Sequence, residues 1–220
     1  MWYRLLKHIL IGPLLRLLGR PKVEGLHHIP LSGPVIIAAN HLAAVDSLYL
    51  ARVVPRRITF LAKHEYFTAT GWRGRIVRAV MAATGQVAVD RTGGSASAAA
   101  LTAAERILNS GGVWGIHPEG SRSPDGRLYR GRTGVIRVAM RTGAPVIPVA
   151  LSGTDRVNPR GRRLWRPGRV RILVGEPRRF PPLDRHGVRI ATDELMSELA
   201  LRSGQHYVDR YATTFAEKSA

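Results

Sequence analysis

Short apolar runs alternate along this chain with segments of helical periodicity, and this alternation constrains the fold more than any other feature. The runs predict strands at residues 22–26, 34–40, 58–63, 86–91, 113–118, 145–151 and 170–175. The intervening segments predict helices at residues 47–54, 72–84, 95–109, 133–141 and 188–202. Short strands separated by helices are typical of an α/β fold, with helices flanking a mixed, mostly parallel sheet. A length of 220 residues indicates a single domain.

The charge of the chain is strongly positive. Lysine and arginine total 34 against 15 acidic residues, a net charge of +19, and only four of these cations are lysines. A field of this sign attracts phosphorylated substrates, anionic lipid or nucleic acid, and arginine binds phosphate oxygens in pairs. The chain contains no cysteine, which excludes disulfides, zinc–thiolate sites and a thiol nucleophile.

His41 and Asp46 lie within the stretch "NHLAAVDSLYL", directly after an apolar run. In one continuous helix their side chains would point about 140° apart, so they can meet only if His41 ends a strand and Asp46 begins a helix. In that layout His41 is a general base, and Asp46 orients its ring. The alternative is a loop histidine followed by an ordinary aspartate helix cap. The pair alone leaves both interpretations open.

Cations follow three other apolar runs. Lys63, Arg91 and Arg122 each lie at or just beyond the end of a predicted strand, where α/β proteins bind their ligands. Arg122 belongs to the turn "HPEGSRSPDG", whose glycines and serines leave backbone N–H groups available for an anion. One base and three cations at strand ends predict a site for a hydroxyl group and a phosphate. No metal site is expected.

Four sequence blocks together resemble the glycerolipid acyltransferases, the family of 1-acylglycerol-3-phosphate acyltransferases. In the family's order these blocks read "NHLAAVD", "AKHEYF" with "GQVAVDR", "PEGSRS" and "APVIPVAL", covering roughly residues 23–151. The chain departs from the family pattern at three places. His117 stands where a phenylalanine is usual, Ser121 replaces a threonine, and "GRTG" (residues 131–134) replaces Phe-Lys-x-Gly.

The resemblance implies transfer of an acyl group from a coenzyme A or acyl carrier protein thioester to a hydroxyl of lysophosphatidic acid. His41 would be the general base, oriented by Asp46. Lys63, Arg91 and Arg122 would bind the acceptor phosphate, while a loop of Glu119, Gly120 and Ser121 would shape the site. The thioester is a co-substrate, and no cofactor is expected. Glycerol 3-phosphate or a glycolipid hydroxyl is an alternative acceptor.

The first 20 residues are apolar, but Arg4, Lys7, Pro13 and Arg16 interrupt them. The longest apolar stretch is far shorter than the roughly 20 residues of a membrane span, and no small-residue cleavage site follows, so a signal peptide is not expected. The apolar residues recur at helical spacing, which predicts either an amphipathic helix in the membrane interface or a helix packed on the protein core. Residues 21–210 would form the acyltransferase domain, and residues 211–220 a tail.

A product with two acyl chains resides in a bilayer, so the resemblance predicts a peripheral protein on the cytoplasmic face of the cell membrane, bound to anionic lipid.

The net charge of +19 is also compatible with a nucleic-acid-binding protein. However, aromatic residues make up only 6% of the chain and are not interleaved with its basic runs. A scaffold with a decayed active site is disfavoured because the His-x4-Asp pair is intact. Nucleic acid is therefore not an expected partner.

Overall fold

The computed structural model describes residues 9, 11–63, 68, 70–72, 74–75, 78, 86–89, 96–162 and 164–212. Within this part, seven strands form one sheet in the order β1-β8-β7-β2-β5-β3-β4. Neighbouring strands run parallel except β7 and β8, which are antiparallel. The strands are β1 Lys22–Glu24, β2 Val35–Ala39, β3 Ile58–Lys63, β4 Val87–Val89, β5 Val113–Ile116, β7 Val146–Ser152 and β8 Arg171–Val174. The predicted fold class, a mixed and mostly parallel sheet flanked by helices, is confirmed.

The central strand β2 is buried along its whole length. Its residues alternate between two cores: Ile37 and Ala39 face one side of the sheet, and Ile36 and Ala38 face the other. A strand covered on both faces has no solvated side, which explains why its sequence is a continuous apolar run.

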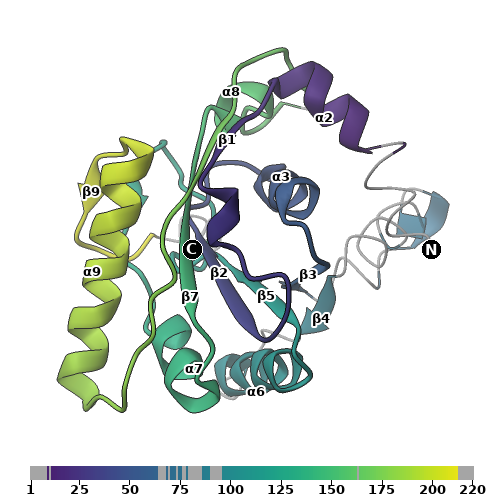
Figure 1. Cartoon of the computed structure of the whole chain (residues 1–220). Helices are drawn as coiled ribbons and strands as arrows, with labels where there is room; N and C mark the ends of the chain where they lie inside the picture. Colours follow the sequence, from purple (N-terminus) through teal and green to yellow (C-terminus); the bar gives the residue numbers. More distant parts are fainter. Residues whose placement is uncertain are drawn as a thin grey trace.

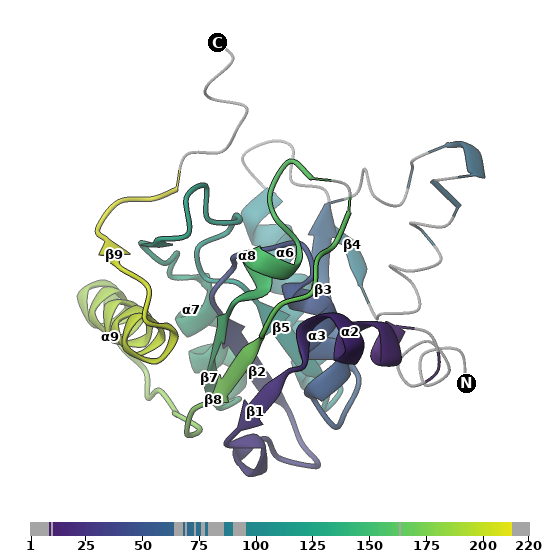
Figure 2. The same ribbon diagram turned by 90° about the horizontal axis from the view of Figure 1, so that it is seen from above.

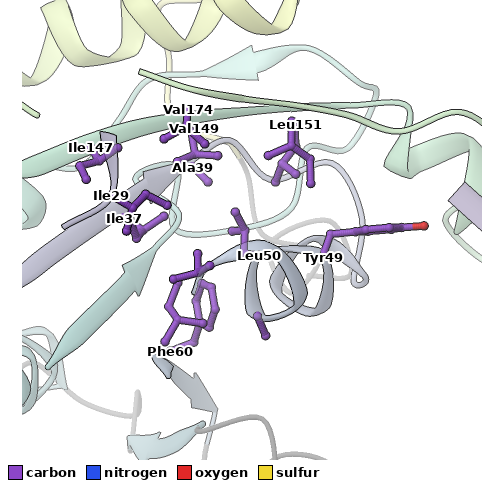
Figure 3. Close-up of a cluster of buried hydrophobic side chains, with 14 of the residues drawn as sticks. Ile29, Ile37, Ala39, Tyr49, Leu50, Phe60, Ile147, Val149, Leu151 and Val174 are labelled. Atoms are coloured by element: carbon purple, nitrogen blue, oxygen red, sulfur yellow. The ribbon is translucent and has the colours of Figure 1, made fainter. Parts of the chain in front are cut away.

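Helices cover both faces of the sheet. On one face α2 and α3 pack with α8, and on the other lie α6, α7 and α9 (Figures 1 and 2). The helices are α2 Ile11–Gly19, α3 Asp46–Val53, α6 Ala96–Asn109, α7 Gly134–Thr142, α8 Thr154–Val157 and α9 Arg185–Ser203. Leu50 of α3 and Phe60 of β3 meet the β2 and β7 side chains in the first core (Figure 3).

Most predicted elements are present with small changes at their ends. The strand predicted at 22–26 stops at Glu24, because Gly25 has a left-handed backbone (φ 75°) and a short 3-10 helix follows at Leu26–His28. The helix predicted from 188 begins at Arg185, because the Asp184 side chain caps it by accepting the Gly187 N–H at 2.7 Å. Most of the predicted helix 72–84 lies outside the described residues.

The prediction missed three short elements. A second, two-stranded parallel sheet pairs β6 (Leu128–Tyr129) with β9 (Tyr207–Val208). The single-turn helix α8 lies between the strands predicted at 145–151 and 170–175, where no helix was predicted. Each element is too short for its hydrophobic periodicity to be recognised.

Helix α2 contacts α3 and α8 and also presents apolar side chains to solvent. Leu15 is fully buried, and its carbonyl accepts the Tyr49 hydroxyl at 3.1 Å. Leu14 and Leu17 are 46% and 73% exposed. The helix is therefore packed on the protein core, as one of the two interpretations predicts, and it retains an unburied apolar side. Among the described residues no helix is long and apolar enough to cross a bilayer.

Asn40 extends the hydrogen bonding between β2 and β7 by one residue beyond the end of β2. Its fully buried side chain accepts the Leu151 N–H at 2.7 Å and donates to the Leu151 carbonyl at 2.8 Å. The same amide donates to Gln205 Oε1 at 2.6 Å, and Gln205 donates to the Gly126 carbonyl at 2.7 Å. The end of β2, and with it the position of His41, is thus fixed from two sides.

We expect Asn40→Ala to lower the free energy of unfolding by about 2–4 kcal/mol, because both polar groups of the Leu151 backbone lose a buried partner. Chemical denaturation measures this change. Asn109→Ala, at the exposed end of α6, is the matched control and should change stability by less than about 0.5 kcal/mol. Equal effects of the two substitutions would contradict the bridging role of Asn40.

Candidate active site

His41 and Asp46 are in contact. His41 follows the end of β2, Asp46 is the first residue of α3, and the His41 Nδ1 lies 2.9 Å from the Asp46 Oδ2. An ionised carboxylate can only accept a hydrogen bond, so this contact puts the ring proton on Nδ1 and leaves the lone pair on Nε2. A carboxylate that holds an imidazole in this tautomer prepares Nε2 to accept a proton.

The Asp46 carboxylate organises the turn between β2 and α3. Its Oδ2 also accepts the backbone N–H groups of Leu42 at 2.7 Å and Ala43 at 2.8 Å, and the whole residue is buried. The expectation of an ordinary helix cap is wrong, because Val45 holds the cap position. The carboxylate turns back to N–H groups that precede the helix, and so joins the turn to the histidine.

Glu119 holds the backbone of His41 from the other side. It is 1% exposed, its Oε1 accepts the His41 N–H at 2.8 Å, and its Oε2 accepts the Tyr129 N–H at 3.1 Å. Burial raises the pKa of Glu119 to about 7, with the negative charge of Asp46 adding to the increase and the two backbone donors opposing it. Both oxygens are occupied inside the protein, so the geometry makes Glu119 a support of the loop.

The loop after β5 turns tightly beside this support. Gly120 has a left-handed backbone (φ 78°), and its N–H donates to the His117 carbonyl at 2.9 Å. A Cβ at Gly120 would lie 2.9 Å from the Arg132 Nε, which belongs to an exposed, flexible side chain, so it is the left-handed backbone that favours glycine here. Farther along, the Ser123 N–H donates to the His41 carbonyl at 2.8 Å. The loop and His41 are therefore joined through main-chain atoms.

The structure describes the side chains of only some of the other predicted site residues. The Ser121 hydroxyl is buried without a hydrogen-bond partner among the described residues, whereas Arg122 is exposed. Lys63 is the last residue of β3 and is paired with Val89 of β4. Arg91 lies outside the described residues, as does the side chain of Lys63. Of the three predicted phosphate ligands, the structure therefore describes the side chain of Arg122 alone.

Two residues that were not among the predicted site residues lie next to residues that were. The exposed Arg132 lies over Gly120 and adds a second cation to the loop of Arg122. His117 stacks on His41, with ring centroids 3.9 Å apart and an angle of 9° between the ring planes. In the sequence His117 stands out as a departure from the family pattern, whereas Arg132 keeps the basic residue of the Phe-Lys-x-Gly pattern. Within the described part of the chain, no group of three or more histidine and acidic side chains could hold a metal ion.

The comparisons with known proteins agree with this architecture. A model of the family described as Acyltransferase matches residues 20–152. The chain belongs to this acyltransferase family.

Among its relatives, the mouse 1-acyl-sn-glycerol-3-phosphate acyltransferase alpha is 30% identical over 77% of this chain and 56% of its own length. The 1-acyl-sn-glycerol-3-phosphate acyltransferase of Borreliella burgdorferi is 33% identical over 60% of this chain and 51% of its own. The chain thus spans about half the length of these relatives.

A solved structure shares the fold. The crystal structure of the 1-acyl-sn-glycerophosphate (LPA) acyltransferase, PlsC, from Thermotoga maritima superposes with a TM-score of 0.69 at 24% sequence identity. The match covers 89% of this chain and 77% of that one.

The raised pKa of Glu119 makes stability depend on pH in a definite direction. Folded Glu119 keeps its proton up to about pH 7, whereas its ordinary pKa is 4.5. The folded state therefore binds more protons between these values, and this contribution, full at low pH, is lost as the pH rises through 7. We expect the unfolding free energy of the wild type, relative to Glu119→Gln, to fall by about 2–3 kcal/mol from about pH 4.5 to about pH 8.

Denaturation curves at several pH values measure this difference. Glu176→Gln, at an exposed position, is the matched control. An equal slope for both variants, or a difference that rises with pH, would contradict the effect of burial on Glu119.

Proposed function

We propose that this protein is an O-acyltransferase that moves a fatty acyl group from a thioester to a hydroxyl of lysophosphatidic acid. The observation that carries the proposal is the contact of His41 Nδ1 with the buried Asp46 Oδ2 at 2.9 Å, which leaves Nε2 as the proton acceptor. The names of the relatives in mouse and Borreliella burgdorferi support the acceptor class.

The reaction proceeds by direct attack. The acceptor hydroxyl gives its proton to His41 Nε2 as its oxygen forms a bond to the thioester carbonyl carbon, and Asp46 stabilises the imidazolium. The tetrahedral intermediate then collapses, the carbon–sulfur bond breaks, and the leaving thiolate takes the proton from His41. The products are the ester and the free thiol, and His41 returns to its neutral form. No acyl-enzyme is needed, in keeping with a chain that has no cysteine.

Cations position the acceptor in this proposal. Lys63, Arg91 and Arg122 bind the phosphate, and Arg132 joins them because it lies beside Gly120 in the same loop as Arg122. Holding the phosphate fixes the hydroxyl near the base, so that the binding energy lowers the activation barrier of the reaction. The acyl donor is the thioester of coenzyme A or of acyl carrier protein. Glycerol 3-phosphate presents the same phosphate and hydroxyl and is the alternative acceptor.

The decisive experiment follows product formation by mass spectrometry, with an acyl-coenzyme A and either lysophosphatidic acid or glycerol 3-phosphate. We expect lysophosphatidic acid to be acylated, and His41→Ala to lower kcat by about 10²–10⁴-fold because the general base is lost. His186→Ala, an exposed histidine at the start of α9, is the matched control and should leave the rate unchanged. A His41→Ala enzyme with wild-type turnover would rule out this mechanism. Acylation of glycerol 3-phosphate alone would show that glycerol 3-phosphate, and not lysophosphatidic acid, is the acceptor.

We further propose that the protein is peripheral, on the cytoplasmic face of the cell membrane, with anionic lipid as its partner. Support comes from α2, where Leu14 and Leu17 are exposed while Leu15 is buried against the protein. Arg16 lies on the same helix and is exposed. Leucines in the acyl boundary and arginine at the headgroups would bind the surface of a bilayer without crossing it.

The double variant Leu14→Ser/Leu17→Ser should bind vesicles of anionic phosphatidylglycerol about tenfold more weakly, because two apolar side chains no longer enter the lipid. Flotation of the full chain with these vesicles measures binding. Leu201→Ser, which changes a leucine that is 85% exposed on α9, is the control and should bind as the wild type does. Equal binding by all three proteins, or no binding by any, would contradict a membrane role for α2.

A further inference from the structure

His117 is held rigidly against His41. The two imidazole rings are nearly parallel at 3.9 Å, and Phe60 stacks behind His117 at 5.7 Å with an interplanar angle of 13°. The His117 ring is thus nearly parallel to two neighbouring rings, and these contacts restrict how far it can tilt.

Hydrogen bonds fix the rotation of the His117 ring. Its Nδ1 lies 2.9 Å from the carbonyl oxygen of Ala39 and 3.1 Å from that of Asn40, and its Nε2 lies 3.3 Å from the Ser47 Oγ. Carbonyl oxygens only accept, so Nδ1 carries the proton, and Nε2 is left to accept from the serine hydroxyl. These partners belong to the end of β2 and the first turn of α3, the same two elements that carry His41 and Asp46.

The geometry excludes a direct role for His117 in proton transfer. Its ring nitrogens are both engaged with protein groups. Rings that stack face to face at 3.9 Å do not direct an N–H of one at the nitrogen of the other. His117 thus acts on the reaction only through the ring it touches.

We propose that His117 is a positioning residue for His41: its flat, neutral ring sets the plane of the base and leaves room beside it for a single positive charge. This inference rests on the proposed role of His41 as the general base. When His41 accepts a proton, the cation forms against an uncharged ring face. A protonated His117 would instead place a second positive charge at the same contact and would lose its bond from Ser47.

Burial and the neighbouring His41 support a neutral ring. Together they lower the pKa of His117 to about 3, against a smaller opposing effect of the Asp46 carboxylate and of the two carbonyls that accept from Nδ1. The charged and titratable groups that face His117 among the described residues are His41 and Asp46. With this pKa the ring is neutral in the neutral pH range.

The test compares two apolar replacements of similar size. His117→Phe keeps a flat ring for His41, whereas His117→Leu fills the space without one. We expect His117→Leu to lower kcat on the order of tenfold, because a displaced His41 removes the proton of the acceptor hydroxyl more slowly. KM should stay within about twofold of the wild-type value, because acceptor binding is unchanged. His117→Phe should retain kcat within about threefold of the wild type. A His117→Leu enzyme with wild-type kcat, or equal losses in both variants, would overturn the proposal.

A second measurement uses the unaltered full chain in detergent micelles and does not depend on activity or on the variants folding. Nitrogen-15 NMR of the histidine rings should show His117 with its proton on Nδ1 and a bare Nε2 down to about pH 5. Protonation of His117 above that pH, or the opposite tautomer, would overturn the proposal. Absence of turnover in the wild type would refute the proposed function instead, and the NMR result would still decide the state of His117.

Discussion

The site depends on one oxygen atom. Oδ2 of Asp46 receives the His41 ring and the backbone N–H groups of Leu42 and Ala43 at 2.7–2.9 Å. A negative oxygen inside the protein needs several donors to offset the loss of water, and here the donors are the backbone of the turn and the His41 ring. The same interaction therefore shapes the backbone and selects the tautomer of the histidine, so neither can change without the other.

Around this oxygen the protein builds supports from distant parts of the chain. Glu119 holds the backbone of His41, and His117 holds its ring. Both follow β5, the strand beside β2 in the sheet. Parallel neighbours bring their carboxyl ends to the same edge, which is why residues far apart in sequence converge on one histidine.

The sequence predicted the seven-stranded sheet, and it predicted the pairing of His41 with Asp46 only with the help of the family resemblance. A strand such as β2 is buried on both faces, so its apolar run is visible without a structure. The residues showed only that the two side chains can meet if a strand ends at His41 and a helix begins at Asp46, and the four sequence blocks in the family's order favoured that contact over a capped helix. The function of Asp46 in the turn could not be predicted, because caps and turns use the same residue types and differ only in which N–H groups they bind.

Other parts of the structure depend on contacts that produce no periodic pattern in the sequence. β6 and β9 have two residues each, and their pairing is made by backbone atoms of any sequence. The stacking of His117 on His41 likewise follows from the placement of two strands. Composition showed an excess of cations, yet it could not tell that Arg132 lies over Gly120.

The hydrogen bonds of Asn40 show how far along the chain the residues that hold the site extend. The family match stops at residue 152, yet the Asn40 amide, next to His41, is bonded to Gln205, which follows α9 and in turn holds the loop at Gly126. The segment after α9 is therefore part of the site's framework rather than an appendage. A domain boundary drawn from sequence similarity would separate His41 from one of its supports, and chimaeras that exchange the matched segment between relatives need to carry α9 and its following turn with it.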